Sequence, residues 1–234
     1  TSVRLGMVFV SLDDECPTLD EYFGDAFESM EEVMGTKELE VFHYHRFVMR
    51  ANWKQWHETN MELYHDWGHI VNRTTGAIAE DYHERRWKMY PNGHGMVSPF
   101  QARYNNYGGW QDRDKHTLPG LTAGEVRVID LFPNTTLIAR ATAFRIDTST
   151  PISPGQTLIE FRGLGVKDEP EEQRAMRVKH HNQFWGPFGR NLLEDVLFVE
   201  AVEESKRTPI SSRELYVEDR SLGIRGYIDE LVLN

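Results

Sequence analysis

The segment EVRVIDLFPNTTLIARATAFRIDTSTPISPGQTLIEFRGLGV, residues 125–166, decides the fold of this 234-residue chain. It holds three runs that are rich in β-branched and aromatic residues, which favour strands. The runs cover residues 125–132, 135–148 and 157–166. Pro133-Asn134 and Pro151–Gly155 separate them, and such residues are typical of turns. The segment is therefore predicted to form an antiparallel meander.

More strands are expected before the meander. Residues 86–90 and 95–104 flank Pro91-Asn92-Gly93, where Asn-Gly is a turn signal. A further strand is predicted at 38–49, with His43 and His45 on one face.

Helical patterns occupy the two ends of the chain. One acidic amphipathic helix is predicted at 19–34, before Gly35, and three more are predicted after the meander. The three later helices cover 169–185, 191–206 and 223–233. Strands grouped in the middle with helices at the ends predict an α+β fold, an antiparallel sheet covered on one face.

Composition restricts the kind of protein. With 39% hydrophobic and 12% aromatic residues, the chain is expected to form a single domain over residues 1–234. A formal charge of -11 argues against nucleic acid or an anionic membrane as a partner. Apolar runs such as Leu5–Val10 are far shorter than the roughly 20 residues that span a bilayer. Because Cys16 is the only cysteine, there is no internal disulfide, which fits a reducing cytoplasm.

A mostly buried helix predicted around residues 52–71 carries metal-binding residue types. Glu58, Glu62, His65 and His69 follow one another at intervals of four, three and four residues, which places them on one helical face. Two imidazoles one turn apart can bind one ion if a third ligand comes from elsewhere. Two histidines and one carboxylate form the site used for O2-activating non-haem Fe(II).

Asp195 is the predicted third ligand. It lies 126 residues after His69, within an otherwise apolar helix start. Burying an unpaired carboxylate there is costly, and a cation would offset that cost.

Other histidines are interpreted differently. His57-Glu58 begins a zinc-protease helix motif, but that motif requires a histidine where Met61 stands. The remaining candidates are interpreted as structural or surface histidines: His43, His45, His180 and His181.

Several short motifs occur in a fixed order along the chain. They are Gly6–Asp14, Thr18–Gly24, Asn52–Lys54 with Glu58, Tyr64-His65, Phe132–Asn134, and Gly186–Gly189 leading to Glu194-Asp195. Together they resemble the catalytic domain of the large (alpha) subunit of Rieske-type ring-hydroxylating oxygenases. The resemblance implies a helix-grip fold, in which a curved antiparallel sheet is flanked by helices and the substrate cavity lies between them.

The resemblance also implies roles for individual residues. The family's two histidines and late aspartate bind mononuclear iron, which corresponds to His65, His69 and Asp195. Its histidines usually have four residues between them, whereas this pair has three, which changes a π-type bulge into regular α spacing. Glu62 stands where the family usually has an aspartate that links the iron to the Rieske cluster of a neighbouring subunit, so it is the expected electron-relay residue.

The cofactors implied are mononuclear Fe(II), a [2Fe-2S] Rieske cluster and NAD(P)H acting through a separate reductase. A Rieske cluster needs two cysteines and two histidines, which a single cysteine cannot supply. The predicted buried strand at 3–12 starts at once, without an initiator Met. We therefore expect the carboxy-terminal portion of a longer chain, separated from an amino-terminal Rieske domain.

The expected partners are O2, a small organic substrate, a reductase and a ferredoxin. A small beta subunit and a homotrimer or α3β3 assembly are also implied by the resemblance. The product is a monohydroxylated or cis-dihydroxylated compound, and the substrate is an aromatic acid or another small organic acid such as a sulfonate. The aromatic residues expected to line the cavity are Phe184, Trp185, Phe188 and Phe198.

Three alternatives stay open at this stage. A helix-grip module that binds a ligand without metal explains the sheet and the aromatic content. A zinc-dependent hydrolase could use the same three ligands. A purely structural subunit is the third alternative.

Overall fold

A computed structural model describes the chain except for residues 63, 71, 73–84, 103–112 and 208–234. The described residues contain a seven-stranded sheet with the order β3-β9-β8-β7-β6-β5-β4, and every neighbouring pair is antiparallel. Its strands are β3 Leu39–Met49, β4 Trp87–Met89, β5 Gly95–Gln101, β6 Glu125–Leu131, β7 Thr135–Arg140, β8 Ala143–Ser153 and β9 Gln156–Val166. The predicted antiparallel meander is confirmed as β6 to β9.

One predicted strand is in fact two. The run 135–148 forms β7 and β8, which pair with each other and place Arg140 opposite Ala143. Ala141 in the connecting turn has a φ of 50°, which non-glycine residues rarely adopt. The turn contains no glycine, proline or asparagine, so its residue types gave no turn signal.

The helices near the amino end are shorter than the sequence pattern predicts. The predicted helix 19–34 is divided into α1 Leu19–Phe23, η1 Gly24–Phe27 and α2 Glu28–Met34. Gly24 causes the break because its φ of 50° is incompatible with a continuous α-helix. Thr18 starts α1 through a capping box with Glu21.

The later helices agree with the predictions where the chain is described. They are α5 Glu171–Phe184 and α6 Arg190–Lys206, and the helix predicted at 223–233 lies outside the described residues. The strand predicted at 95–104 is β5 up to Gln101, and its last two residues also lie outside. The predicted turn at Pro91–Gly93 is the 3-10 turn η4. Another 3-10 turn, η5, covers Arg113–His116.

The amino-terminal segment is a hairpin and not one buried strand. β1 Ser2–Arg4 pairs with β2 Met7–Phe9 around a turn in which Leu5 and Gly6 both have positive φ. Val3 and Val8 are exposed by 66% and 63%, so the expectation of a buried strand is wrong here.

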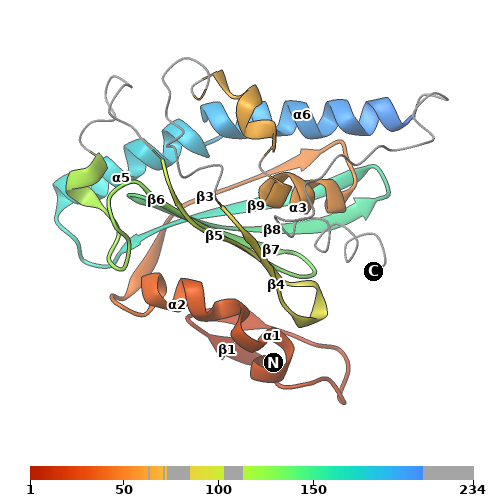
Figure 1. Ribbon diagram of the computed structural model, residues 1–234, viewed down its shortest axis with the longest axis horizontal. Coiled ribbons are helices and arrows are strands. Elements are labelled where there is room, and N and C mark those ends of the chain that lie inside the picture. Colours follow the sequence, from red (N-terminus) through yellow and green to blue (C-terminus); the bar gives the residue numbers. More distant parts are fainter. Residues whose placement is uncertain (63, 71, 73–84, 103–112, 208–234) are drawn as a thin grey trace.

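Helices cover both faces of the main sheet, although the sequence predicted a cover on one face only. Figure 1 shows α5, α6 and α3 (Trp53–Glu62) on one side of the sheet, and α1 and α2 on the other. We call these the catalytic face and the outer face. Neighbouring residues of β6 alternate between them: Val128 belongs to the core of the catalytic face, and Ile129 to that of the outer face. The sheet therefore separates two cores.

Among the described helices, none is long and apolar enough to cross a membrane.

Candidate metal centre

The segment that carries the two histidines is not one continuous helix. α3 ends at Glu62, and Tyr64–Gly68 forms the 3-10 turn η2. The His69 N–H donates to the Asp66 carbonyl oxygen, a bond over three residues that continues this tighter winding. The expectation of regular α spacing between the histidines is therefore wrong.

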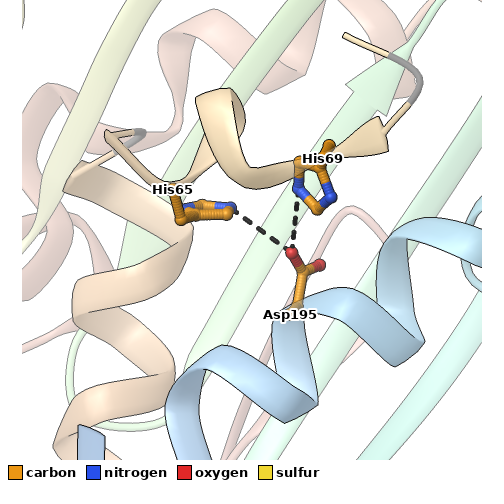
Figure 2. Close-up of side chains that lie close together, drawn as sticks. All are labelled: His65, His69 and Asp195. Carbon is orange, nitrogen blue, oxygen red and sulfur yellow. Dashed lines mark ion pairs between the residues drawn. The ribbon is translucent and has the colours of Figure 1, made fainter. Parts of the chain in front are cut away.

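Three side chains nevertheless converge as expected. His65 Nε2 lies 3.3 Å from Asp195 Oδ1, and His69 Nε2 lies 3.1 Å from the same oxygen. Figure 2 shows both imidazoles directed at this carboxylate, which projects from α6. One ligand atom from each of the three residues lies within 4.8 Å of the others. No other group of three such residues is found in the described part of the chain.

The three residues fit a metal ion. Asp195 is 7% exposed, and its Oδ1 atom makes no hydrogen bond of good geometry although it faces two imidazole nitrogens. A buried oxygen that faces two nitrogens without such a bond is the arrangement that a cation between them would satisfy. Two imidazoles and one carboxylate are the donors of the 2-His-1-carboxylate iron site, which leaves coordination positions open.

The pKa shifts of Asp195, His65 and His69 are consistent with a metal-binding role for the carboxylate. Burial by itself would raise the pKa of Asp195, but the two imidazoles outweigh it and hold that pKa well below its usual range. Burial also opposes protonation of both histidines. Interaction with Asp195 nevertheless raises the pKa of His65 and of His69 above the ordinary value. The carboxylate thus stays ionised and available as a ligand.

A second carboxylate orients each imidazole. His65 Nδ1 donates to Glu62 Oε1, and His69 Nδ1 donates to Glu194 Oε2 over 2.6 Å. Because an ionised carboxylate can only accept, these bonds place the proton on Nδ1 and leave Nε2 free to face Asp195. Such outer carboxylates fix the ring orientation of metal-binding histidines.

The sequence predicted some of these surroundings and missed others. Glu62 was expected as an electron relay, and the geometry adds an orienting contact to His65. Glu194 was not assigned a role, although its position beside a candidate ligand was a signal. Asp66 was also missed, and its Oδ1 atom lies 3.9 Å from Nε2 of both histidines. Glu58 is not part of the three-residue group.

A cavity adjoins the metal centre. Its lining includes the three candidate ligands, Asp66 and side chains from α3, α6 and the catalytic face of the sheet. The remaining lining residues are Thr59, Asn60, Asn72, Phe100, Ala102, Val126, Val128, Ile138, Arg140, Arg145, Trp185 and Asn191.

The four aromatic residues expected around this cavity have different positions. Trp185 lines the cavity, as expected. The ring of Phe198 lies 6.4 and 5.9 Å from the rings of His65 and His69, outside the lining. Phe184 is fully buried in the core of the catalytic face. Phe188 is 91% exposed, so the expectation that it lines the cavity is wrong.

The other histidines lie away from the metal centre. His43, His45 and His181 form a cluster in which the rings of His43 and His181 are 4.7 Å apart. Burial, followed by the neighbouring His43 and Arg145, lowers the pKa of His45 to about 4. His180 Nδ1 lies 2.7 Å from the Thr142 hydroxyl, and both residues are fully buried. None of the four belongs to the three-residue group.

A third polar arrangement resembles a hydrolytic triad. His57 Nδ1 lies 2.6 Å from Asp130, and its Nε2 lies 2.7 Å from the Ser149 hydroxyl. All three residues are 1% exposed or less, and none lines the cavity. A substrate cannot reach the Ser149 hydroxyl in this position, so the arrangement is part of the core.

The fold and the converging His65, His69 and Asp195 are those expected of a non-haem metal protein, and the comparisons with known proteins identify the family. Residues 36–231 match the family described as ring hydroxylating alpha subunit (catalytic domain). The chain belongs to this family.

Three curated relatives are similar to the chain. The alpha subunit of 2-aminobenzenesulfonate 2,3-dioxygenase from Alcaligenes sp is 50% identical over 198 residues, which are 84% of this chain and 50% of that protein. The hydroxylase alpha subunit of methanesulfonate monooxygenase from Methylosulfonomonas methylovora is 37% identical over 233 residues, which are 96% of this chain and 56% of that protein. The alpha subunit 2 of the terminal component of terephthalate 1,2-dioxygenase from Comamonas sp is 26% identical over 212 residues, 83% of this chain and 51% of that protein. The chain spans about half the length of these relatives.

Solved structures share the fold at low sequence identity. The quaternary ammonium Rieske monooxygenase CntA, in complex with an inhibitor, matches with a TM-score of 0.73 at 16% identity over 97% of this chain and 58% of that chain. Naphthalene 1,2-dioxygenase from Rhodococcus sp., bound to indole, matches with a TM-score of 0.70 at 18% identity over 90% of this chain and 55% of that chain. The expected α+β fold of Rieske oxygenase catalytic domains is thereby confirmed.

Proposed function

We propose that this chain is the iron-binding catalytic part of a Rieske non-haem iron oxygenase that hydroxylates or cis-dihydroxylates an organic acid. His65, His69 and Asp195 are the proposed Fe(II) ligands. The observation that carries the proposal is the convergence of their three ligand atoms within 4.8 Å at the edge of a cavity. Family membership supports the same assignment.

Different residues of the chain have different roles in the proposed site. When bound, Fe(II) in a two-histidine, one-carboxylate site supplies O2 activation at its open positions. Glu62 and Glu194 hold the imidazoles with Nε2 facing inward, and Asp195 contributes the negative charge. The apolar wall of Phe100, Val126 and Ile138 excludes water beside the ligands and positions the substrate.

Electrons for O2 activation have to reach the proposed iron site from another redox centre. The proposal assigns that role to a [2Fe-2S] Rieske cluster, reduced by NAD(P)H through a reductase or a ferredoxin. Cys16 as the only cysteine cannot hold the cluster in this chain alone. Glu62 is the proposed relay residue, because it is only part-buried and contacts His65. A homotrimer or α3β3 assembly in the cytoplasm, with a neighbouring subunit supplying the cluster, belongs to the same proposal.

The substrate is proposed to be an organic sulfonate or carboxylate. The names of the three curated relatives specify 2-aminobenzenesulfonate, methanesulfonate and terephthalate as their substrates, and all three are organic anions.

Metal analysis tests the iron site. The chain is reconstituted anaerobically with Fe(II), desalted and assayed for bound iron, alongside Asp195→Ala, His65→Ala and the exposed control Glu172→Ala. We expect close to one iron per chain for the unchanged protein and the control. Loss of a ligand should remove nearly all of it, while circular dichroism shows an intact fold.

Two outcomes would contradict the proposal. Iron content that is equal in His65→Ala and in the unchanged chain would favour a metal-free ligand-binding module. Hydrolysis of esters or amides restored by Zn²⁺ without O2, and not by Fe(II), would favour the zinc hydrolase.

A further inference from the structure

We propose that Arg145, together with Arg140, forms the subsite that binds the anionic group of the substrate in the cavity beside the metal centre. The inference rests on the proposed function and deepens it, because it assigns substrate recognition to two residues that are not metal ligands.

Arg145 is a buried cation in the cavity lining. The residue is 1% exposed, yet it lines the cavity together with the candidate metal ligands. Its Nε donates to Asp147 Oδ1 over 2.8 Å, and its Nη2 donates to Asn60 Oδ1 over 2.6 Å. A guanidinium has five N–H groups, and Nη1 makes no hydrogen bond to the described residues. The group therefore has donors left for a ligand.

The guanidinium of Arg145 is held rigidly before any ligand arrives. Its central carbon lies 4.8 Å from the ring centre of Phe161 and 4.9 Å from that of Trp185. The two hydrogen bonds described above fix its orientation in its own plane. A donor that is already fixed loses little conformational entropy on binding, which favours recognition of a planar or tetrahedral anion.

Asp147 accepts a hydrogen bond from only one nitrogen of the Arg145 guanidinium. The second oxygen of Asp147 accepts the Trp56 Nε1–H over 2.7 Å, so the carboxylate binds Arg145 through one oxygen only. The frequent fork-to-fork geometry of a purely structural arginine–carboxylate pair uses two parallel bonds. Here Nη2 binds the neutral amide of Asn60 instead, and Nη1 stays available.

Arg140 adds a second cation on the same face of the sheet. In the register of β7 and β8, Arg140 lies opposite Ala143 and Arg145 lies opposite Ile138. The two arginines are therefore diagonal neighbours, which long side chains can bridge. Arg140 lines the same cavity, with its guanidinium 4.3 Å from the ring centre of Phe184. Two cations that line one cavity make its potential more positive, which favours an anionic ligand.

The rest of the lining fits the remainder of such a molecule. Phe100, Val126, Val128 and Ile138 supply an apolar wall from β5, β6 and β7. A ligand with one anionic group and an apolar body therefore matches the cavity. Aryl and short alkyl sulfonates and carboxylates have this form, whereas a neutral hydrocarbon offers no acceptor to Arg145 Nη1.

Calorimetric titration with paired probes tests the subsite. Benzenesulfonate, benzoate and the neutral analogue benzenesulfonamide are titrated into the chain, first without metal and then after loading with Fe(II) under anaerobic conditions. We expect the unchanged chain to bind one of the two anions at least about 10-fold more tightly than the sulfonamide, because a hydrogen bond between two charged groups is stronger than one to a neutral group. The comparison of benzenesulfonate with benzoate shows which anion the site prefers.

Charge-neutral variants identify the residues. Arg145→Gln and Arg140→Gln should each weaken binding of the preferred anion by about 10-fold or more and leave sulfonamide binding within about twofold. Arg46→Gln, an exposed arginine on β3, is the control and should change neither. If Arg145→Gln does not fold, the double variant Arg145→Gln, Asp147→Asn removes the buried pair together, and Arg140→Gln still tests the site.

The result separates this inference from the proposed function. Equal affinity for anion and sulfonamide, or unchanged anion binding in both arginine variants, would overturn the subsite. Iron content is measured in the same variants and should stay near one per chain. A chain that fails to bind iron but keeps arginine-dependent anion binding would refute the iron site alone.

Discussion

The two faces of the main sheet share the same strands but enclose different cores. On the outer face, α1 and α2 pack against an apolar core that includes Phe27, Met30, Leu137 and Phe144, each fully buried. The catalytic face encloses buried charges beside its apolar residues. Asp147 lies between Arg145 and Trp56, and His57 lies between Asp130 and Ser149.

This difference arises from alternation along single strands. In β8, Phe144 and Ile146 point to the outer face, whereas Arg145 and Asp147 point to the catalytic face. Burying charged groups is costly unless each is paired and hydrogen-bonded. Burial of apolar surface on the outer face therefore stabilises the fold. This stabilisation offsets the cost of burying polar groups beside the metal centre on the catalytic face.

Removing a charge from the catalytic face should lower the free energy of unfolding more than the other changes. Asp147→Ala leaves Arg145 buried without its counter-charge and Trp56 Nε1 without an acceptor. We expect the free energy of unfolding to fall by about 3–5 kcal/mol, as measured by urea denaturation. Asp147→Asn keeps an acceptor for Trp56 and serves as the matched comparison, with a smaller loss. A loss below about 1 kcal/mol for Asp147→Ala would mean that the network is dispensable.

Removing volume from the outer face should affect stability without affecting the metal centre. Met30 on α2 is fully buried, and Met30→Ala is expected to lower the free energy of unfolding by about 2–5 kcal/mol. Iron content should stay unchanged because the sheet lies between this core and the ligands. Glu28→Ala, an exposed substitution on the same helix, should stay within about 0.5 kcal/mol. Iron loss in folded Met30→Ala would show that the two faces are coupled.

The catalytic face should also make stability depend on pH. His181 is fully buried, and burial, followed by the neighbouring His43 and His45, lowers its pKa from 6.5 to about 3. Below about pH 6.5 the unfolded chain binds a proton at this position that the folded chain does not bind. The free energy of unfolding should therefore fall with decreasing pH, by about 2 kcal/mol from this group at about pH 5.

His57 acts in the opposite direction, so a single variant is needed to isolate His181. Burial opposes protonation of His57, but Asp130 raises the pKa of His57 above 6.5. Protonated His57 therefore stabilises the folded chain at low pH, and this stabilisation is lost as the pH rises through the raised pKa. The measurement is the difference in unfolding free energy between pH 7 and pH 5 for the unchanged chain and for His181→Asn. The variant should show a difference smaller by about 2 kcal/mol. Asn182→Ala, an exposed neighbour on α5, should behave as the unchanged chain.

Much of the fold followed from local sequence patterns. The runs 125–132 and 157–166 predicted β6 and β9 because branched residues and turn residues act over short distances. The turn at Ala141-Thr142 was missed, since neither residue favours a positive φ. The second helical layer was also missed, because the pattern of 19–34 shows an apolar face but not which sheet face it covers.

The metal centre was likewise predicted in part from the sequence. His65, His69 and Asp195 were candidates from their chemical types, their spacing and the resemblance to a family. The carboxylates around them were harder to predict, because Glu194 meets His69 from 125 residues further along the chain. Such a contact depends on how α6 packs against η2, which no local pattern specifies.

By itself, the sequence determined the antiparallel sheet, the three candidate ligands and the limit that a single cysteine sets on iron–sulfur chemistry. Only the tertiary structure decided that the histidines lie on and after a 3-10 turn, that Glu62 and Glu194 orient them, and that Arg145 and Arg140 share a cavity with them. The reason is physical: strand and turn preferences are properties of neighbouring residues, whereas a cavity is formed by side chains that only the packing of distant elements brings together.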